Sequence, residues 1–180
     1  MTSYADMSLF ARPRIVMQER EDGCMLLRSA DSLQDYPGTV VHSLWAWALA
    51  DPDYPLVAER DADGSWRACS YGAAVAAAAA IGQALLERGL SRDRPLLVLS
   101  GNSIDHLLMT LGAMTAGVPV APVSVAYSLQ SRDHARIRAI TELIDPGAVF
   151  AEDAQRFGPA LDALGQVPAI ISTEIGRAHV

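Results

Sequence analysis

Two glycines, Gly112 and Gly117, have the G-x-x-x-x-G spacing of a loop that binds the phosphates of a nucleoside triphosphate. Such a loop continues with Lys and Ser or Thr, and it precedes a helix whose first N–H groups point at the phosphates. Here Val118 and Pro119 follow, and the apolar periodicity places both glycines at the end of a helix. The spacing therefore does not predict a phosphate loop.

The segment Ser100-Gly-Asn-Ser103 lies between an apolar run and a helical pattern. In that place it could bind an anion through backbone N–H groups and the helix dipole. The alternative is structural, with Ser103 as the N-cap residue of the helix and Gly101 in the turn. We favour the structural interpretation.

The titratable side chains do not form a pattern typical of a catalytic or metal site. Asp105 and His106 are adjacent, so their side chains diverge on a helix, and Ser100 does not complete a triad with them. His42 and His134 have no carboxylate or cysteine partner at metal-ligand spacing. From the residues alone we predict no catalytic residue and no metal site, and cofactor-binding residues stay unknown.

Polar residues also follow the apolar run that ends at Val123. Tyr127 and Ser128 lie in the loop after it, which is where open α/β sheets bind ligands. Three arginines come next and could bind the phosphates of a ligand: Arg132, Arg136 and Arg138. We favour the alternative of a solvated helix face, on which Arg138 pairs with Glu142 four residues later.

A βαβ unit at the centre of the sequence would position these residues. The uninterrupted apolar run 96–99 is typical of a parallel strand covered on both faces. A helix over 104–116 follows, and the run 118–123 returns as a neighbouring strand through a right-handed crossover. Gly117 is expected as the C′ residue that ends the helix.

Segments on both sides extend this pattern. Strands are predicted at 24–28, 56–60, 66–70, 148–151 and 168–172, and Asp63-Gly64 indicates a hairpin turn between the second and third of these. Helices are predicted over 40–50 with Thr39 as the N-cap, over 71–88 with Ser70 as the N-cap, from 131 or 133 to 144, and over 153–164. We expect Trp45 and Leu86 on the buried faces of the first two. The alternation predicts an α/β fold with a partial, doubly wound, mainly parallel sheet and flanking helices.

The composition excludes several function classes. The net charge of −7 argues against nucleic acid and against an anionic membrane surface as partners. No apolar run reaches the length of a membrane span, and we expect a cytoplasmic protein. All 14 basic residues are arginine, so this chain cannot complete a mechanism that needs lysine. Cys24 and Cys69 lack metal-type spacing and are expected to be free and reduced.

The stretch VLSGNSIDHLLMTLGAMTAGVPVAPVSVAYSLQS, which ends at Ser131, resembles the acyl-adenylate-forming superfamily and most closely its feruloyl-CoA synthetase branch. The resemblance spans 40–172, and its moderately specific part is the segment Ala-Gly-Val-Pro-Val-Ala-Pro-Val. It implies a parent enzyme that uses ATP and Mg²⁺ to convert an aromatic carboxylate, ferulate or a related hydroxycinnamate, into an acyl-adenylate. The acyl group would then pass to CoA with release of AMP.

The motifs that carry catalysis in this family lie downstream of the matching segment. They are the Ser/Thr/Gly-rich phosphate loop, the adenine- and ribose-binding motifs, the hinge and the catalytic lysine of the small C-terminal domain. We therefore transfer no catalytic residue to this chain. By itself, the fragment is expected to be inactive and to bind no cofactor.

The resemblance suggests three segments. Residues 1–38 are an irregular lead-in, and 39–173 are a truncated N-terminal part of an AMP-binding domain. Residues 174–180 can be encoded by a nucleotide string that reads like a sequencing adapter, and we expect them to be an assembly artefact. Two alternatives stay open: a non-catalytic nucleotide- or CoA-binding module, and a small structural α/β protein.

Overall fold

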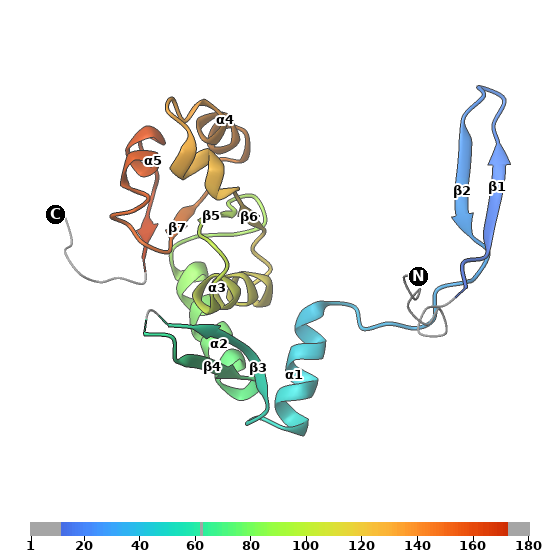
Figure 1. The fold of residues 1–180 in the computed structure, drawn as a ribbon, viewed down its shortest axis with the longest axis horizontal. Coiled ribbons are helices and arrows are strands. Elements are labelled where there is room, and N and C mark those ends of the chain that lie inside the picture. Colours follow the sequence, from blue (N-terminus) through green and yellow to red (C-terminus); the bar gives the residue numbers. More distant parts are fainter. Residues whose placement is uncertain (1–11, 62, 173–180) are drawn as a thin grey trace, which may run out of the picture. The chain divides into compact units, whose positions relative to one another are not determined.

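The computed structural model describes residues 12–61 and 63–172 (Figure 1). The chain divides into two compact units, Met1–Pro37 and Gly38–Val180, and each is described by itself. The expectation for residues 174–180 falls outside the described residues. Within the described ranges, no helix is both long and apolar enough to cross a membrane.

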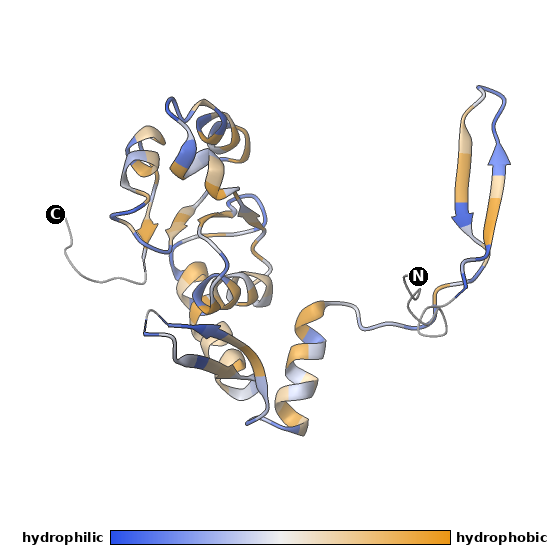
Figure 2. Cartoon of the chain, in the orientation of Figure 1, coloured by the Kyte–Doolittle hydropathy of each residue, from blue (hydrophilic) through white to orange (hydrophobic). Residues whose placement is uncertain are grey.

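The first unit contains an antiparallel hairpin of β1 (Ile15–Glu19) and β2 (Met25–Ser29). The strand expected at 24–28 is present as β2, but its partner β1 was not expected. Gly23, at φ +78°, provides the left-handed residue of the turn. Figure 2 shows apolar residues on both strands. The following apolar side chains are exposed: Ile15, Val16, Met17, Met25, Leu26 and Leu27. Among the described residues, these side chains are not buried, so the hairpin is stabilised by its turn and its cross-strand pairs.

The second unit is built on a parallel sheet with the strand order β6-β5-β7-β8 (Figure 1). Its strands are β5 (Leu96–Leu99), β6 (Val120–Pro122), β7 (Ala148–Ala151) and β8 (Ile170–Ile171). Val98 pairs with Pro122 of β6 on one side and with Phe150 of β7 on the other. The predicted βαβ unit and the α/β fold class are both confirmed.

Helices cover both faces of this sheet. On one face, α2 (Tyr71–Glu87) and α3 (Ile104–Thr115) enclose a core that contains Leu96 and Val98. On the other face, α4 (Ala135–Ile144) and α5 (Gly158–Ala163) enclose Leu97 and Leu99. Successive residues of β5 thus enter opposite cores, as the uninterrupted apolar run predicts.

Three helices begin at the cap residues that the sequence predicts. Thr39, Ser70 and Ser103 each accept a hydrogen bond from the N–H three residues later, at the starts of α1 (Val40–Ala50), α2 and α3. Gly117, at φ +71°, is the left-handed residue that follows α3. These local signals are strong because each satisfies an N–H or carbonyl group that the helix cannot satisfy internally.

A second antiparallel hairpin lies between α1 and α2 in the chain. It consists of β3 (Pro55–Arg60) and β4 (Trp66–Ser70), in agreement with the predicted pair. Asp63 accepts hydrogen bonds from the N–H and hydroxyl of Ser65, and Gly64 adopts φ +85°. The Asp-Gly turn therefore forms as its composition indicates.

Two expectations about buried faces are wrong. Trp45 is 40% exposed and Leu86 is 48% exposed, although both were expected on buried faces. In α2 the buried residues are mainly small: Ala74, Ala78, Gly82 and Leu85. The reason is that α2 packs closely on α3 through its small side chains, which turns Leu86 toward solvent.

The segment between β6 and β7 departs from the predicted boundaries. The expected loop contains a π-helical turn, η2 (Ala126–Gln130), and α4 begins at Ala135, after His134 in the left-handed region at φ 50°. The helix expected over 153–164 forms only at its end, as α5. Asp153 accepts from the N–H of Arg156 and so caps the turn before α5. Likewise, β8 is shorter than the expected strand.

The crossing of α2 and α3 requires glycine at two positions. A Cβ on Gly112 would lie 2.5 Å from Cγ2 of Ile81, and one on Gly82 would lie 2.9 Å from the carbonyl oxygen of Gly112. Both distances are shorter than van der Waals contact. The first glycine of the G-x-x-x-x-G spacing is therefore a packing residue, and the second ends the helix.

We expect Gly112→Val to lower the free energy of unfolding by about 3 kcal/mol, because the added atoms overlap Ile81 and the backbone of Ala78. Urea denaturation of the 180-residue chain, followed by circular dichroism, measures the change. Gly158→Val is the control, since a Cβ there meets no atom within 4 Å. Equal losses in both variants would contradict the close helix crossing.

Candidate functional site

Between the carboxyl ends of β5 and β7, the connections of the chain switch from one face of the sheet to the other. The chain leaves β5 into α3 on one face and leaves β7 toward α5 on the other. Open α/β sheets commonly bind ligands in the crevice between two such connections. A ligand site is therefore expected at this edge of the sheet.

The carboxylate of Glu152, directly after β7, lies at this point. Its Oε2 accepts hydrogen bonds from the hydroxyl of Ser100 at 3.1 Å and from the N–H of Gly101 at 3.0 Å. Ser100 is buried, with 6% of its surface exposed. The chain thus supplies its own anion to the turn where a ligand anion could otherwise bind.

The first N–H groups of α3 also have acceptors within the chain. The N–H of Ile104 donates to Oε2 of Glu59 on β3 at 2.7 Å, and the N–H of His106 donates to Oγ of Ser103 at 3.1 Å. Both acceptors stabilise the positive end of the helix dipole. The structure therefore agrees with the capping interpretation of the Ser100–Ser103 segment.

A charged cluster of Glu59, Arg67 and Asp105 joins the β3–β4 hairpin to α3. The guanidinium of Arg67 donates to Oε1 of Glu59, and its Nη2 lies 3.6 Å from Oδ2 of Asp105. The hydrogen bond from Arg67 lowers the pKa of Glu59 despite partial desolvation, and the same bond raises the pKa of Arg67. Asp105 and His106 diverge as predicted, because His106 contacts Gly101 instead.

His106 contacts the turn through its ring. Its Nδ1 lies 2.9 Å from the carbonyl oxygen of Gly101. The ring lines two recesses, one of about 370 Å³ against the β6 loop and one of about 290 Å³ along α3. The ring of His106 thus combines a hydrogen-bonded position with two neighbouring recesses, which its place in the sequence did not indicate.

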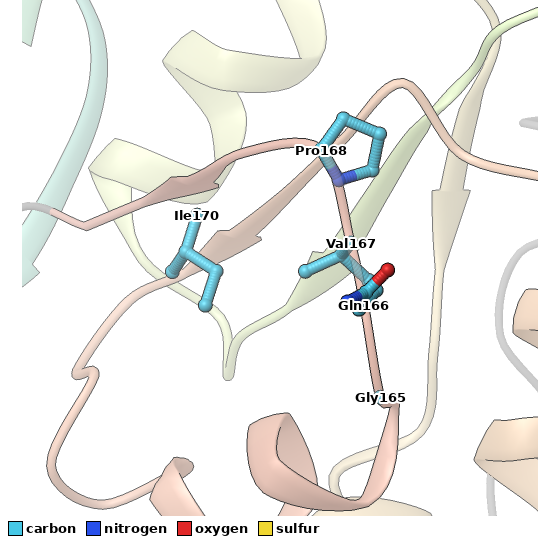
Figure 3. A pocket seen from close by; sticks show the side chains of 5 residues that line it. All are labelled: Gly165, Gln166, Val167, Pro168 and Ile170. Carbon is cyan, nitrogen blue, oxygen red and sulfur yellow. The ribbon is translucent and has the colours of Figure 1, made fainter.

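A recess of about 490 Å³ lies beside β8 (Figure 3). Five residues line it: Gly165, Gln166, Val167, Pro168 and Ile170. Among these five described lining residues, the amide of Gln166 is the only polar side-chain group, and none of the five side chains is titratable.

The residues after β6 pack against one another. Nη1 of Arg136 donates to the hydroxyl of Tyr127 at 3.2 Å and its guanidinium lies 5.1 Å from the ring centre. Ser128 is buried, at 3% exposure. Neither Tyr127 nor Ser128 lines a recess near the turn after β5.

The arginine cluster does not converge on one point. Nη1 of Arg138 donates to the carbonyl of Asp133 at 2.7 Å, so the expected pair with Glu142 is not formed. Arg132 and Arg136 are exposed, in agreement with a solvated helix face. The pKa of Asp133 is lowered, mainly by the N–H of Ala135.

The remaining candidates do not gather into a site. His42 is exposed on α1, and Nδ1 of His134 lies 3.4 Å from the carbonyl of Tyr127. In residues 12–61 and 63–172, no three His, Cys, Asp or Glu side chains are grouped to hold a metal ion. Cys24 and Cys69 are free thiols as predicted, and burial raises the pKa of Cys69.

Comparison with protein families gives a match over most of the second unit. Residues 44–177 match the family described as AMP-binding enzyme, a span that includes the parallel sheet and the turn after β5. The chain belongs to the AMP-binding enzyme family. The predicted superfamily is thereby confirmed, whereas the match does not distinguish the feruloyl-CoA synthetase branch.

Solved structures share the fold of this AMP-binding family member. A fatty acyl-adenylate ligase from L. pneumophila has a TM-score of 0.60 at 18% identity, covering 72% of this chain and 22% of that one. A Mycobacterium tuberculosis fatty acyl CoA synthetase has a TM-score of 0.59 at 16% identity, with coverages of 74% and 26%. CmiS6 has a TM-score of 0.55 at 26% identity, with coverages of 68% and 30%.

The chain therefore spans between a fifth and a third of the length of these solved relatives. No curated protein matches it.

The family uses ATP, but the described residues do not fit a nucleotide phosphate or its Mg²⁺. The N–H groups of Gly101 and Ile104 already donate to Glu152 and Glu59, and two carboxylates beside the turn would repel a polyphosphate. The chain has no lysine. The N–H donors at the turn after β5 and at the start of α3 are therefore already used within the chain.

We expect Glu59→Gln to remove about 1 kcal/mol of stability at pH 7, since the amide keeps an acceptor for Ile104 but loses the ion pair with Arg67. The folded pKa of Glu59 lies below the reference value of 4.5. Its stabilisation is therefore present above that value and is lost as the pH falls through the folded pKa.

Urea titrations between about pH 7 and pH 3 test this expectation. The wild-type chain should lose more stability on acidification than Glu59→Gln, and Glu142→Gln on α4 is the exposed control. Parallel pH profiles for wild type and Glu59→Gln would contradict the role of the carboxylate.

Proposed function

We propose that this chain is the opening part of the N-terminal domain of an ATP-dependent acid–CoA ligase. The observation that carries the proposal is the family match over residues 44–177, which spans the central βαβ unit. Two structural relatives, a fatty acyl-adenylate ligase and a fatty acyl CoA synthetase, support carboxylate activation as the reaction class.

The proposed reaction has two balanced steps. A carboxylate oxygen attacks the α-phosphorus of ATP and pyrophosphate leaves, which gives an acyl-adenylate. The thiol of CoA then attacks the acyl carbon and AMP leaves. Adenylation is needed because a carboxylate is a poor electrophile until one of its oxygens belongs to a good leaving group.

For the substrate we propose a hydroxycinnamate such as ferulate, with Mg²⁺ as the metal that accompanies ATP. The support is the resemblance of the segment 98–131 to the feruloyl-CoA synthetase branch. We also propose a cytoplasmic location, since ATP and CoA are intracellular substrates. The 180 residues would supply the scaffold of one sheet, while catalytic side chains would come from chain beyond it.

Sequencing the genomic locus across codon 173 is the first test. We expect the reading frame to continue into a Ser/Thr/Gly-rich loop that ends in lysine, and residues 174–180 to be replaced. A confirmed stop after Val180 would overturn the ligase proposal for this protein and favour a nucleotide-binding or structural role.

The protein encoded by the recovered reading frame can then be assayed for ATP–pyrophosphate exchange. We expect exchange that depends on ferulate in the recovered protein and none in the 180-residue chain, because the chain has no lysine to stabilise the adenylate. Fatty acids and benzoate are the comparison substrates. Exchange with a fatty acid but not with ferulate would retain the ligase class and contradict the substrate.

A further inference from the structure

The recess against the β6 loop combines apolar walls with one oriented nitrogen base. Its lining includes Pro122, Val123 and Val125 on one side and Asn102 and His106 on the other. The recess measures about 370 Å³, which is in the range of small-molecule pockets. It opens at the carboxyl edge of the parallel sheet, where β5 and β6 both end.

The hydrogen bond to Gly101 determines which nitrogen of His106 carries the proton. A carbonyl oxygen can only accept, so Nδ1 must be the donor in this 2.9 Å contact. In the neutral ring, Nε2 then has a free lone pair and can only accept. In residues 12–61 and 63–172, Nδ1 is the ring nitrogen of His106 that has a hydrogen-bond partner.

The position of this carbonyl depends on Glu152. The N–H of Gly101 donates to Oε2 of Glu152, and the carbonyl of the same residue accepts from His106. Ser100 strengthens the arrangement, because its hydroxyl lies within hydrogen-bond distance of both Glu152 and the Gly101 carbonyl. Gly101 thus donates through its N–H to the residue after β7 and accepts through its carbonyl from the imidazole of His106.

We propose that the recess between the turn after β5 and the β6 loop binds a small molecule with an apolar body and a hydroxyl group, whose hydroxyl donates to Nε2 of His106. Glu152 is the positioning residue that keeps His106 in the required tautomer. The apolar walls disfavour a charged ligand, since burial of a charge beside them is costly. This binding site does not depend on the ligase activity.

The first test measures the tautomer in the 180-residue chain. Nitrogen-15 NMR of the imidazoles, assigned with His106→Gln, should show Nδ1–H and an unprotonated Nε2 for His106 in the neutral ring. Glu152→Ala should shift the population toward the mixture of Nδ1–H and Nε2–H tautomers that a free imidazole has. Glu152→Gln keeps an oxygen acceptor and should retain the native tautomer. Glu142→Ala is the matched control on α4.

An Nε2–H tautomer in the wild type would overturn the proposal outright. An unchanged tautomer in folded Glu152→Ala would overturn the positioning role. If Glu152→Ala does not fold, Glu152→Asp gives the decisive comparison, because its shorter side chain withdraws the carboxylate from the N–H of Gly101 and keeps the charge. A shifted tautomer in Glu152→Asp would support the linkage, and an unchanged one would contradict it.

The second test measures binding, with phenol as the probe and anisole as its matched control. Both have an aromatic ring of similar size, but only phenol has a hydroxyl donor. We expect phenol to shift both the Nε2 resonance of His106 and the amide resonance of Gly101 saturably, and anisole to leave both unchanged. In His106→Gln, phenol should no longer shift the amide resonance of Gly101. No response to phenol, or equal responses to both, would overturn the hydroxyl site.

Discussion

Burial of β5 is the constraint on which the second unit depends. Leu96, Leu97, Val98 and Leu99 are each fully buried, because β5 has neighbouring strands on both edges and helices on both faces. Each of these side chains contributes about 1.5–3 kcal/mol when it leaves water. Right-handed connections that run to the two sides of such a strand cross opposite faces of the sheet. The switch from one face to the other therefore lies between β5 and β7.

That switch brings the turn after β5 next to the residue after β7. In many α/β proteins a ligand occupies such a point, but here Glu152 does. Glu59 similarly accepts from the first N–H of α3. Both carboxylates come from elements distant in the sequence, and together they form a joint that links β7 and the β3–β4 hairpin to the turn after β5 and the start of α3. The joint in turn orients the ring of His106.

The match to the AMP-binding enzyme family covers this part of the chain. Within it, Glu152 accepts from the turn after β5, and Glu59 pairs with Arg67 and accepts from the first N–H of α3. Large apolar side chains stay exposed on α1 within the same unit: Val40, Trp45, Trp47 and Leu49. An exposed apolar surface of this kind is typical of a region that contacts other protein.

The sequence alone determined the elements whose signals are local. Caps at Thr39, Ser70 and Ser103, the left-handed Gly117, the Asp-Gly turn and the apolar run of β5 all depend on residues close in the chain, and all were predicted correctly. Only the tertiary structure decided the outward position of Leu86 and the hydrogen bonds that Glu59 accepts from the N–H of Ile104 and Glu152 accepts from the N–H of Gly101. These depend on helix crossing and on contacts between residues some 50 positions apart, such as Gly101 and Glu152 with a separation of 51. No periodicity or local propensity encodes contacts at such separations.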